Sequence, residues 1–234
     1  MGPPAPREPR TARDLAALVF AGGDPPAPGG LPATVGSDLV IAADSGLAHA
    51  RALGVRVDLV IGDLDSVDPD ELAAAVAEGA AVERHPEAKD ATDLELALDA
   101  AFDRGATAVH VVGVGGGRLD HFLGNVLLLA SPRYAAARVD AHVAGAHITL
   151  VHDHVDLEGT PGGFCSLLPL GGPAEGVRTD GLRFPLHRET LAPGTTRGVS
   201  NEFLASTASV SLESGVLLAV VPLPPSSLDP GKDA

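Results

Sequence analysis

Four short acidic clusters stand in the first half of this 234-residue chain. Each of them follows a short apolar run or opens a segment with helical spacing, which in a chain of alternating strands and helices is where ligands bind. Converging carboxylates would repel a polyphosphate unless a hard divalent cation stood between them. The clusters therefore predict a site for Mg²⁺ and ATP. They lie at residues 44–46, 62–66, 89–95 and 116–121.

The cluster at residues 62–66 places Asp63 and Asp65 directly after an apolar run. Two carboxylates separated by one residue suit a shared metal ion. The alternative is that Asp65 and Ser66 cap a helix that begins near Pro69. This pattern alone leaves both interpretations open, and the other clusters favour the metal.

The cluster at residues 89–95 combines a cation with several anions. Asp90, Asp93 and Glu95 could simply complement the dipole of a helix that starts here, at roughly 0.3 to 1 kcal/mol per charge. Lys89 is unhelpful to such a helix. It is useful where a phosphate must be held beside metal-bound carboxylates, so we favour a functional role.

A glycine-rich turn at residues 113–117 follows an apolar run and precedes a helical segment. In that position backbone N–H groups can approach a phosphate closely. The turn lacks the Gly-Lys-Ser/Thr ending of a P-loop and the full dinucleotide fingerprint. Its significance comes from Arg118, which can grip a phosphate, and from Asp120 and His121, which are alternative candidates for the base.

The composition limits the classes of binding partner and indicates the cellular compartment. With 16 basic and 31 acidic residues the formal charge is −15, which argues against nucleic acid and anionic membranes as partners. Cys165 is the single cysteine, so no internal disulfide can form, and a cytoplasmic location is expected. Residues 1–13 contain no apolar core of signal-peptide length, and no apolar run is long enough to span a bilayer. The Pro-containing ends, residues 1–13 and 224–234, are expected to be disordered.

Between residues 14 and 150, continuous apolar runs alternate with segments of helical spacing. This pattern predicts an α/β domain with a mostly parallel sheet and helices on both faces. The expected strands are residues 15–21, 39–43, 57–61, 109–112 and 141–143. The expected helices are residues 46–53, 69–78, 92–104 and 119–130.

The sequence also indicates where the third helix begins and which side chains line the fourth. Thr92 followed by Glu95 matches a capping box, so the third helix begins at an acidic cluster. The fourth helix leaves Arg118, His121 and Asn125 along one edge, beside an apolar stripe. That stripe consists of Leu119, Phe122, Leu123, Val126 and Ala130.

Residues 151–223 show period-two stretches and turn residues, and no helix of ordinary length. They predict a small antiparallel β-sandwich domain. His152, His154 and Asp156 have a spacing that also occurs in zinc sites. The favoured interpretation is that they form the solvent-facing side of a half-buried strand. The remaining histidines show no readable partner pattern; they include His49, His85 and His110.

Five motifs in order resemble the thiamine pyrophosphokinase family, from about residue 15 to 221. They are residues 43–46, 62–66, 89–95, 116–121 with Asn125, and 198–201. The resemblance implies an α/β catalytic domain, a β-sandwich that helps to bind thiamine, and a homodimer with active sites between the subunits. It also implies the reaction, in which ATP and thiamine give thiamine diphosphate and AMP with Mg²⁺ required.

The resemblance also assigns residues. Asp63, Asp65 and Asp93 serve the metal, and Arg118 and Asp120 serve the reacting groups beside them. The ATP site consists of Asp44, Lys89, Asp90, Thr92, Gly116, Gly117, Arg118, His121 and Asn125. Thiamine is expected to contact Asp120, Ser200, Asn201 and Phe203, the last as the stacking ring because the chain has no Trp.

Two other functions remain as alternatives. A phosphatase of the haloacid dehalogenase type would use Asp63 as its nucleophile, but it leaves residues 89–95 and 118–121 without a role. A non-catalytic nucleotide or thiamine-binding protein would keep the fold without turnover. Release of AMP from ATP and thiamine distinguishes the predicted enzyme from both.

Overall fold

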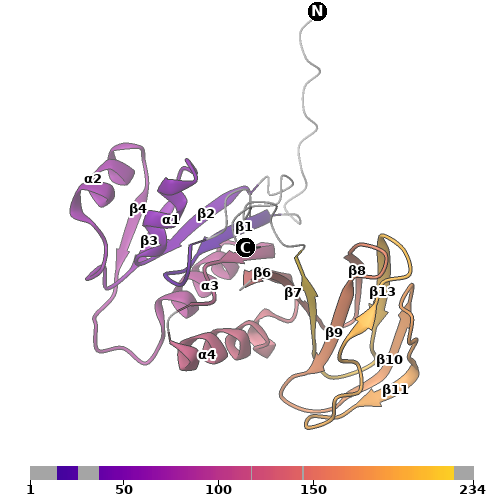
Figure 1. Ribbon diagram of the computed structural model, residues 1–234. Helices are drawn as coiled ribbons and strands as arrows, with labels where there is room; N and C mark the ends of the chain where they lie inside the picture. The colour runs from indigo at the N-terminus through magenta and orange to yellow at the C-terminus, as the bar shows by residue number, and fades with distance from the viewer. Residues whose placement is uncertain (1–14, 26–36, 117, 144, 224–234) are drawn as a thin grey trace, which may run out of the picture.

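The computed structural model of the chain describes residues 15–25, 37–116, 118–143 and 145–223. The ends predicted to be disordered, 1–13 and 224–234, and Gly117 of the predicted ATP site lie outside the described residues. The described residues form two lobes, with the first half of the chain in one and the last third in the other (Figure 1).

A ten-stranded sheet runs through both lobes. Its strands are β1 (Leu15–Phe20), β2 (Leu39–Ala43), β3 (Leu59–Gly62), β4 (Ala81–Arg84), β5 (Ala106–Val112), β6 (Arg138–Val143), β7 (Ala146–Val151), β9 (Phe164–Pro169), β12 (Asn201–Glu202) and β14 (Leu217–Pro222). They are ordered β12-β9-β14-β7-β6-β5-β1-β2-β3-β4. The pairs from β6 to β4 are parallel. The pairs from β6–β7 to β9–β12 are antiparallel.

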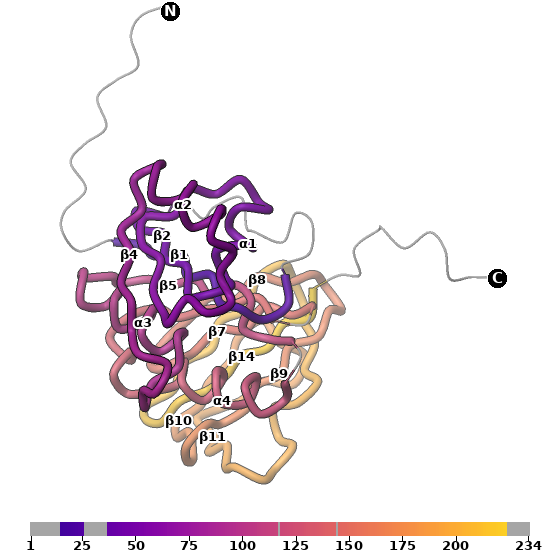
Figure 2. Tube along the Cα trace, turned by 90° about the vertical axis from the view of Figure 1, so that its left-hand side faces the viewer, coloured from indigo at the N-terminus to yellow at the C-terminus, as the bar shows by residue number. Residues whose placement is uncertain are grey.

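Helices cover both faces of the parallel half, as predicted (Figures 1 and 2). They are α1 (Gly46–Ala52), α2 (Pro69–Ala77), α3 (Asp93–Asp103), α4 (Leu119–Leu129) and the short 3-10 helix η1 (Pro132–Tyr134). Strand alternation divides the core, because Leu18 packs with Leu47 of α1 whereas Val19 packs with Leu98 of α3. No helix in the described part of the chain is long and apolar enough to cross a membrane.

The strand order creates a crevice between β1 and β5. From β1 the chain proceeds outward through β2, β3 and β4, and it then returns to the other side of β1 as β5. The loops that leave β1 and β5 therefore diverge. In open α/β sheets, ligands bind at such a point, outside the carboxyl ends of the strands.

The second lobe is the predicted antiparallel β-sandwich. Its four-stranded sheet consists of β8 (His154–Glu158), β10 (Ala174–Asp180), β11 (His187–Leu191) and β13 (Thr207–Ser211). This sheet packs against the antiparallel end of the large sheet, around buried residues such as Leu167 of β9 and Val210 of β13. The two lobes thus share one continuous sheet, and the predicted boundary at residue 150 falls within β7.

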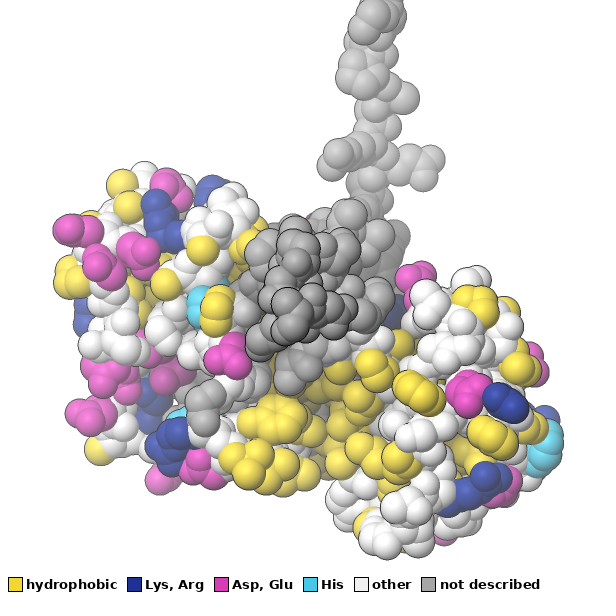
Figure 3. Space-filling model, in the orientation of Figure 1, with side chains coloured by type: hydrophobic (Ala, Val, Ile, Leu, Met, Phe, Trp, Pro, Cys, Tyr) yellow, Lys and Arg dark blue, Asp and Glu magenta, His cyan; other side chains and the backbone are white. Residues whose placement is uncertain are grey.

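The apolar stripe predicted for α4 was partly wrong. Val126 and Leu129 are buried, whereas Leu119, Leu123 and Leu127 are 69%, 51% and 59% exposed. The helix is apolar on two sides and only one of them meets the sheet. The hydrophobic patch that remains is visible at the position of α4 (Figure 3).

Candidate active site

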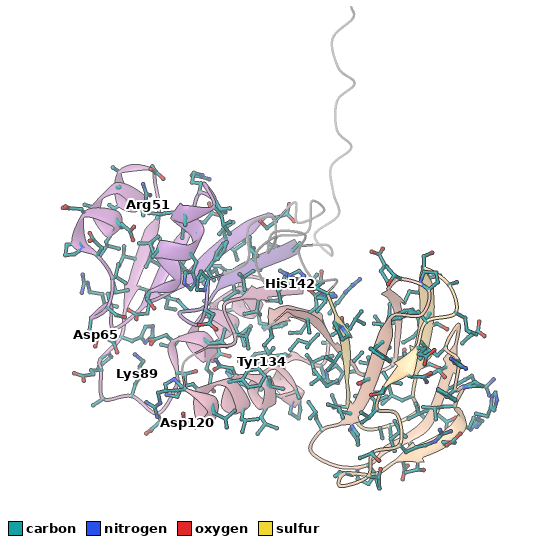
Figure 4. All side chains as sticks on the ribbon, viewed as in Figure 1. Arg51, Asp65, Lys89, Asp120, Tyr134 and His142 are labelled. Carbon is teal, nitrogen blue, oxygen red and sulfur yellow. The ribbon has the colours of Figure 1, made fainter. Side chains whose placement is uncertain are left out.

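A cleft of about 600 Å³ lies at the carboxyl ends of β1, β2, β3 and β5. It brings together nine of the predicted site residues from loops far apart in the sequence. They are Asp44, Asp63, Lys89, Thr92, Asp93, Gly116, Arg118, His121 and Asn125. Asp65, Asp90 and Asp120 are not among its lining residues. Asp65, Lys89 and Asp120 lie on the same side of the α/β lobe (Figure 4).

Three carboxylates converge in the cleft. One oxygen each from Asp44, Asp63 and Asp93 lies within 4.8 Å of the other two. Asp44 follows β2 with a φ of 47°, Asp63 follows β3, and Asp93 opens α3. Asp44 is thus the third carboxylate of the group, in the place where the sequence pattern indicated Asp65.

Asp65 stands just outside this group. Its backbone N–H donates to Asp63 Oδ1 at 3.3 Å. The charge of Asp63 raises the pKa of the Asp65 carboxyl group, with smaller contributions from desolvation and from Asp44. The alternative role of Asp65 and Ser66 as helix caps is excluded, because Asp68 caps α2.

Lys89 joins two of the three carboxylates. Its Nζ lies 2.8 Å from Asp93 Oδ1 and 3.2 Å from Asp63 Oδ2, and its side chain is 14% exposed. Burial acts to lower the pKa of Lys89, but the bonds and charges of Asp93 and Asp63 outweigh it and the pKa is raised. The backbone bond from Asp65 and the bond from Lys89 lower the pKa of Asp63. Lys89 therefore stays charged beside ionised Asp63.

Two oxygens of the group are buried without a hydrogen-bond donor among the described residues. They are Asp44 Oδ1 and Asp93 Oδ1. Asp93 Oδ1 has the Lys89 charge nearby, but not in hydrogen-bond geometry. Asp44 Oδ2, by contrast, accepts a bond from Ser66. Buried carboxylate oxygens without donors fit a divalent cation, which takes oxygen ligands and needs no proton.

The start of α3 fixes Asp93 in the cleft. Thr92 Oγ1 accepts a bond from the Glu95 backbone N–H at 3.2 Å, which confirms Thr92 as the N-cap. The Glu95 carboxylate pairs with Arg133 at 3.2 Å, so it was wrong to expect a reciprocal capping box. Asp93 lies in the first turn of α3, where the N-terminus of a helix favours a negative charge.

Two glycines allow the backbone to close around the cleft. A Cβ at Gly23, after β1, would lie 2.0 Å from the Gly115 carbonyl oxygen. A Cβ at Gly62, whose φ is 143°, would lie 2.9 Å from Asp93 Oδ1. The loop of Gly22, Gly23 and Asp24 was not predicted as part of the site, although it directly follows the apolar run at residues 15–21.

Arg118 and Asp120 form an exposed ion pair with an Nη2–Oδ2 distance of 2.5 Å. The bond from Arg118 lowers the pKa of Asp120 to about 2 despite some desolvation. A carboxylate so acidic is a weak base in this arrangement. His121 lines both the cleft and the adjoining hollow, whereas Asp120 lines the hollow alone.

Two of the predicted thiamine residues, Ser200 and Asn201, line a hollow of about 370 Å³ in the second lobe. Asp120 belongs to α4 of the first lobe, and Phe203 is not among the lining residues of this hollow. Ser200 lines it with an exposed side chain and a φ of 57°. Asn201 is buried, and its amide accepts from the Phe184 N–H at 2.9 Å and donates to the Phe184 carbonyl at 2.8 Å. The side-chain amide of Asn201 therefore holds the Phe184 backbone.

The expected stacking role of Phe203 was wrong. Phe203 is 2% exposed and belongs to the sandwich core, with its ring against Gly159. Phe184 is 51% exposed and lines the hollow with Ser200. Phe184 is thus the exposed phenylalanine ring at this hollow, and no pattern in the sequence separates it from Phe203.

The fold and the cleft define a two-lobed α/β protein in which three carboxylates and Lys89 meet at the carboxyl ends of parallel strands. Two family models match the chain, "Thiamin pyrophosphokinase, catalytic domain" over residues 34–140 and "Thiamin pyrophosphokinase, vitamin B1 binding domain" over residues 152–217. The chain belongs to the thiamine pyrophosphokinase family.

Individual relatives support the assignment. A thiamine pyrophosphokinase from Bacillus subtilis is 28% identical over 184 residues, covering 78% of this chain and 86% of that protein. A crystal structure of thiamine pyrophosphokinase from Bacillus subtilis matches with a TM-score of 0.75 over 89% of this chain and 99% of its own at 28% identity. The Geobacillus thermodenitrificans structure matches with a TM-score of 0.74 over 92% and 100% at 26% identity. These findings do not favour the phosphatase or the non-catalytic alternative.

Proposed function

We propose that this chain transfers the diphosphoryl group of ATP to the hydroxyl group of thiamine, giving thiamine diphosphate and AMP. Family membership supports the reaction class. The single observation that carries the proposal is the convergence of three carboxylates with Lys89 at the carboxyl ends of the strands. A group of this kind can hold a divalent cation and the phosphates that accompany it.

We assign Mg²⁺ to Asp44, Asp63 and Asp93, with Asp65 as a further predicted ligand beside Asp63. The buried oxygens of Asp44 and Asp93 that lack donors support this assignment. When bound, Mg²⁺ would shield the phosphate charge and polarise the phosphoryl group under attack.

The side chains of the cleft supply positioning and charge. Lys89 and Arg118 neutralise non-bridging oxygens of ATP, and the backbone around Gly23 and Gly116 leaves room for the phosphates. The thiamine hydroxyl oxygen attacks the β-phosphorus and AMP leaves. His121 takes up the hydroxyl proton, because its imidazole lines the cleft in which ATP is placed.

The Mg²⁺ assignment separates two neighbouring aspartates. Asp44→Asn should raise the Mg²⁺ concentration for half-maximal activity by about tenfold or more, because it removes an anionic ligand while keeping the shape. Asp65→Asn should also lower Mg²⁺-dependent turnover. Its increase in the Mg²⁺ concentration for half-maximal activity should not exceed that of Asp44→Asn. Mg²⁺ titrations of both variants provide the comparison. If the Mg²⁺ concentration for half-maximal activity were unchanged in Asp44→Asn, the assignment of Asp44 as a Mg²⁺ ligand would be rejected.

Phe184 is the proposed aromatic contact of thiamine. Phe184→Ala should raise the KM for thiamine by about tenfold and leave the KM for ATP nearly unchanged, because an aromatic contact contributes about 1 kcal/mol beyond buried area. Phe164→Ala is the matched control, since Phe164 is 54% exposed in the same lobe but does not line the hollow. Equal changes in the two KM values would reject this role.

We also propose a homodimer. Among the described residues, none lines both the ATP cleft and the Phe184 hollow, so one active site can combine the cleft of one subunit with the hollow of another. The exposed side chains of Leu119, Leu123 and Leu127 offer an apolar surface beside the cleft. The cytoplasmic location expected from the single cysteine stays a prediction.

Leu123→Lys should weaken the dimer, because it places a charge in the middle of the apolar side of α4. Sedimentation analysis should show the molecular mass halved at micromolar concentration, together with a loss of turnover. Leu204→Lys, at a leucine of the second lobe that is 63% exposed, should leave the mass unchanged. A dimer that survives Leu123→Lys would place the interface elsewhere.

A further inference from the structure

A second group of metal-ligand side chains lies apart from the ATP cleft. His110 of β5, Asp140 of β6 and His147 of β7 each offer one ligand atom, and these atoms lie within 4.8 Å of one another. The sequence showed no partner for His110. The reason is that the three residues come from three strands and meet only through the register of the sheet.

The register places the group on one face of the sheet. His110 stands opposite Asp140 in the parallel pair β5–β6, and His142 stands opposite His147 in the antiparallel pair β6–β7. Since side chains alternate along a strand, all four point to the same side. The neighbouring residues along the same strands, such as Val109 of β5 and Val139 of β6, point to the opposite face and pack in the core.

Asp140 is the centre of the group. Its Oδ1 contacts His110 Nδ1 and lies 3.4 Å from His147 Nε2. Its Oδ2 lies 3.3 Å from Arg138 Nε. Arg138 therefore orients the carboxylate so that one oxygen faces both imidazoles. Ligand atoms of a tetrahedral zinc ion with bonds of about 2.0 Å are about 3.3 Å apart, so small side-chain movements suffice.

His142 contacts the imidazole of His110 on the side away from Asp140. Its Nδ1 lies 3.0 Å from His110 Nε2. A metal-binding histidine usually gives its other ring N–H to an acceptor, which fixes the ring and its tautomer. With His110 bound through Nδ1, His142 occupies that position. His142 lies between the lobes and away from Lys89 (Figure 4).

The group faces a cavity of about 640 Å³. Asp156 and Glu158 of β8 line the cavity together with Thr207 of β13, so it extends from the large sheet to the sandwich sheet. Within the described part of the chain, this cavity shares no lining residue with the ATP cleft. The two acidic side chains favour entry of a cation, and the volume leaves room for a water ligand.

We propose that His110, Asp140 and His147 bind a divalent transition-metal ion of the zinc class, with the fourth coordination position open to this cavity. Two imidazoles select zinc, cobalt or nickel over Mg²⁺, which prefers oxygen ligands. The ion joins β5, β6 and β7 at the point where the chain enters the second lobe. This site is independent of the diphosphoryl transfer proposed above.

Zinc binding to the full chain tests the proposal. Equilibrium dialysis against Zn²⁺, with Mg²⁺ in large excess to occupy the carboxylates of the ATP cleft, should give one Zn²⁺ per chain. His147→Ala should weaken binding by more than about 100-fold, since even the loss of an orienting partner costs 10- to 100-fold. His142→Ala should weaken Zn²⁺ binding by 10- to 100-fold, as expected for the loss of an orienting partner. His187→Ala, at an exposed histidine of β11, should bind as the unaltered chain does.

Cobalt provides a readout that does not depend on any variant folding. Co²⁺ held by two imidazoles and a carboxylate in a four-coordinate site should give an intense visible absorption, whereas an octahedral oxygen site absorbs weakly. Absence of stoichiometric Zn²⁺, retention of Zn²⁺ by His147→Ala, or only weak Co²⁺ absorption would each overturn the proposal. The group would then be a hydrogen-bonded network alone.

Discussion

Exchange of Asp93 for asparagine is expected to lower kcat/KM for Mg·ATP by roughly 1,000-fold, which corresponds to about 4 kcal/mol of lost transition-state stabilisation. Asp93 Oδ1 is buried without a hydrogen-bond donor and lies 2.8 Å from Lys89 Nζ. The neutral amide removes an anionic metal ligand and at the same time the partner that holds Lys89 in place.

Steady-state kinetics at several Mg²⁺ concentrations measure this effect. Asp103→Asn is the matched control, because Asp103 is the exposed last residue of the same helix. Circular dichroism and thermal unfolding establish that both variants fold. A folded Asp93→Asn variant with nearly normal activity at ordinary Mg²⁺ would show that the carboxylate group does not hold the reacting complex.

Exchange of Lys89 for methionine is expected to lower kcat by roughly 100-fold, in the range observed when one charge-stabilising donor is removed from an active site. The apolar stem fits the same space, but the charge that neutralises phosphate is lost. The Mg²⁺ requirement should not increase, because Asp63 and Asp93 lose a competing cation.

This difference between kcat and Mg²⁺ requirement separates Lys89 from the carboxylates. Arg56→Met serves as the control, since Arg56 is an exposed cation paired with Asp58 and does not line the cleft. If Lys89→Met lost activity only through weaker Mg²⁺ binding, the lysine would act on the metal site and its proposed contact with phosphate would be rejected.

The first lobe could be predicted well because its signals are local. The apolar runs that became β1, β2, β3 and β5 are continuous, and α3 begins at its predicted cap, Thr92. Carboxyl ends of neighbouring parallel strands meet at one edge. The meeting of Asp63, Lys89 and Asp93 in one cleft therefore followed from the order of the elements.

Other features depend on long-range geometry that no short segment encodes. Residues 44–46 were counted among the acidic clusters of the predicted Mg²⁺ and ATP site, but Asp44 was assigned to ATP and not to the metal. Its position beside Asp63 and Asp93 depends on a positive φ that the motif does not specify. Phe184 and Phe203 are alike in sequence, and only the packing of the sandwich decides that Phe203 is buried. Sequence could not reveal these outcomes because each is decided by contacts with distant strands.

The same reasoning applies to the histidines. His110 and His147 meet Asp140 only because β5, β6 and β7 pair in one register, and a shift of one residue would turn a whole strand's side chains to the other face. Likewise, apolar spacing in α4 could not tell which of its two apolar sides faces the sheet. Val126 proved to be buried and Leu123 exposed.

Phosphorus NMR of the full chain with Mg·ATP and thiamine tests the central claim most directly, because the nucleotide product reports how many phosphoryl units move. The carboxylate site and the family assignment predict AMP and thiamine diphosphate in equal amounts, with turnover abolished when EDTA removes the metal. Formation of ADP with thiamine monophosphate, release of inorganic phosphate, or undiminished turnover in EDTA would contradict the account.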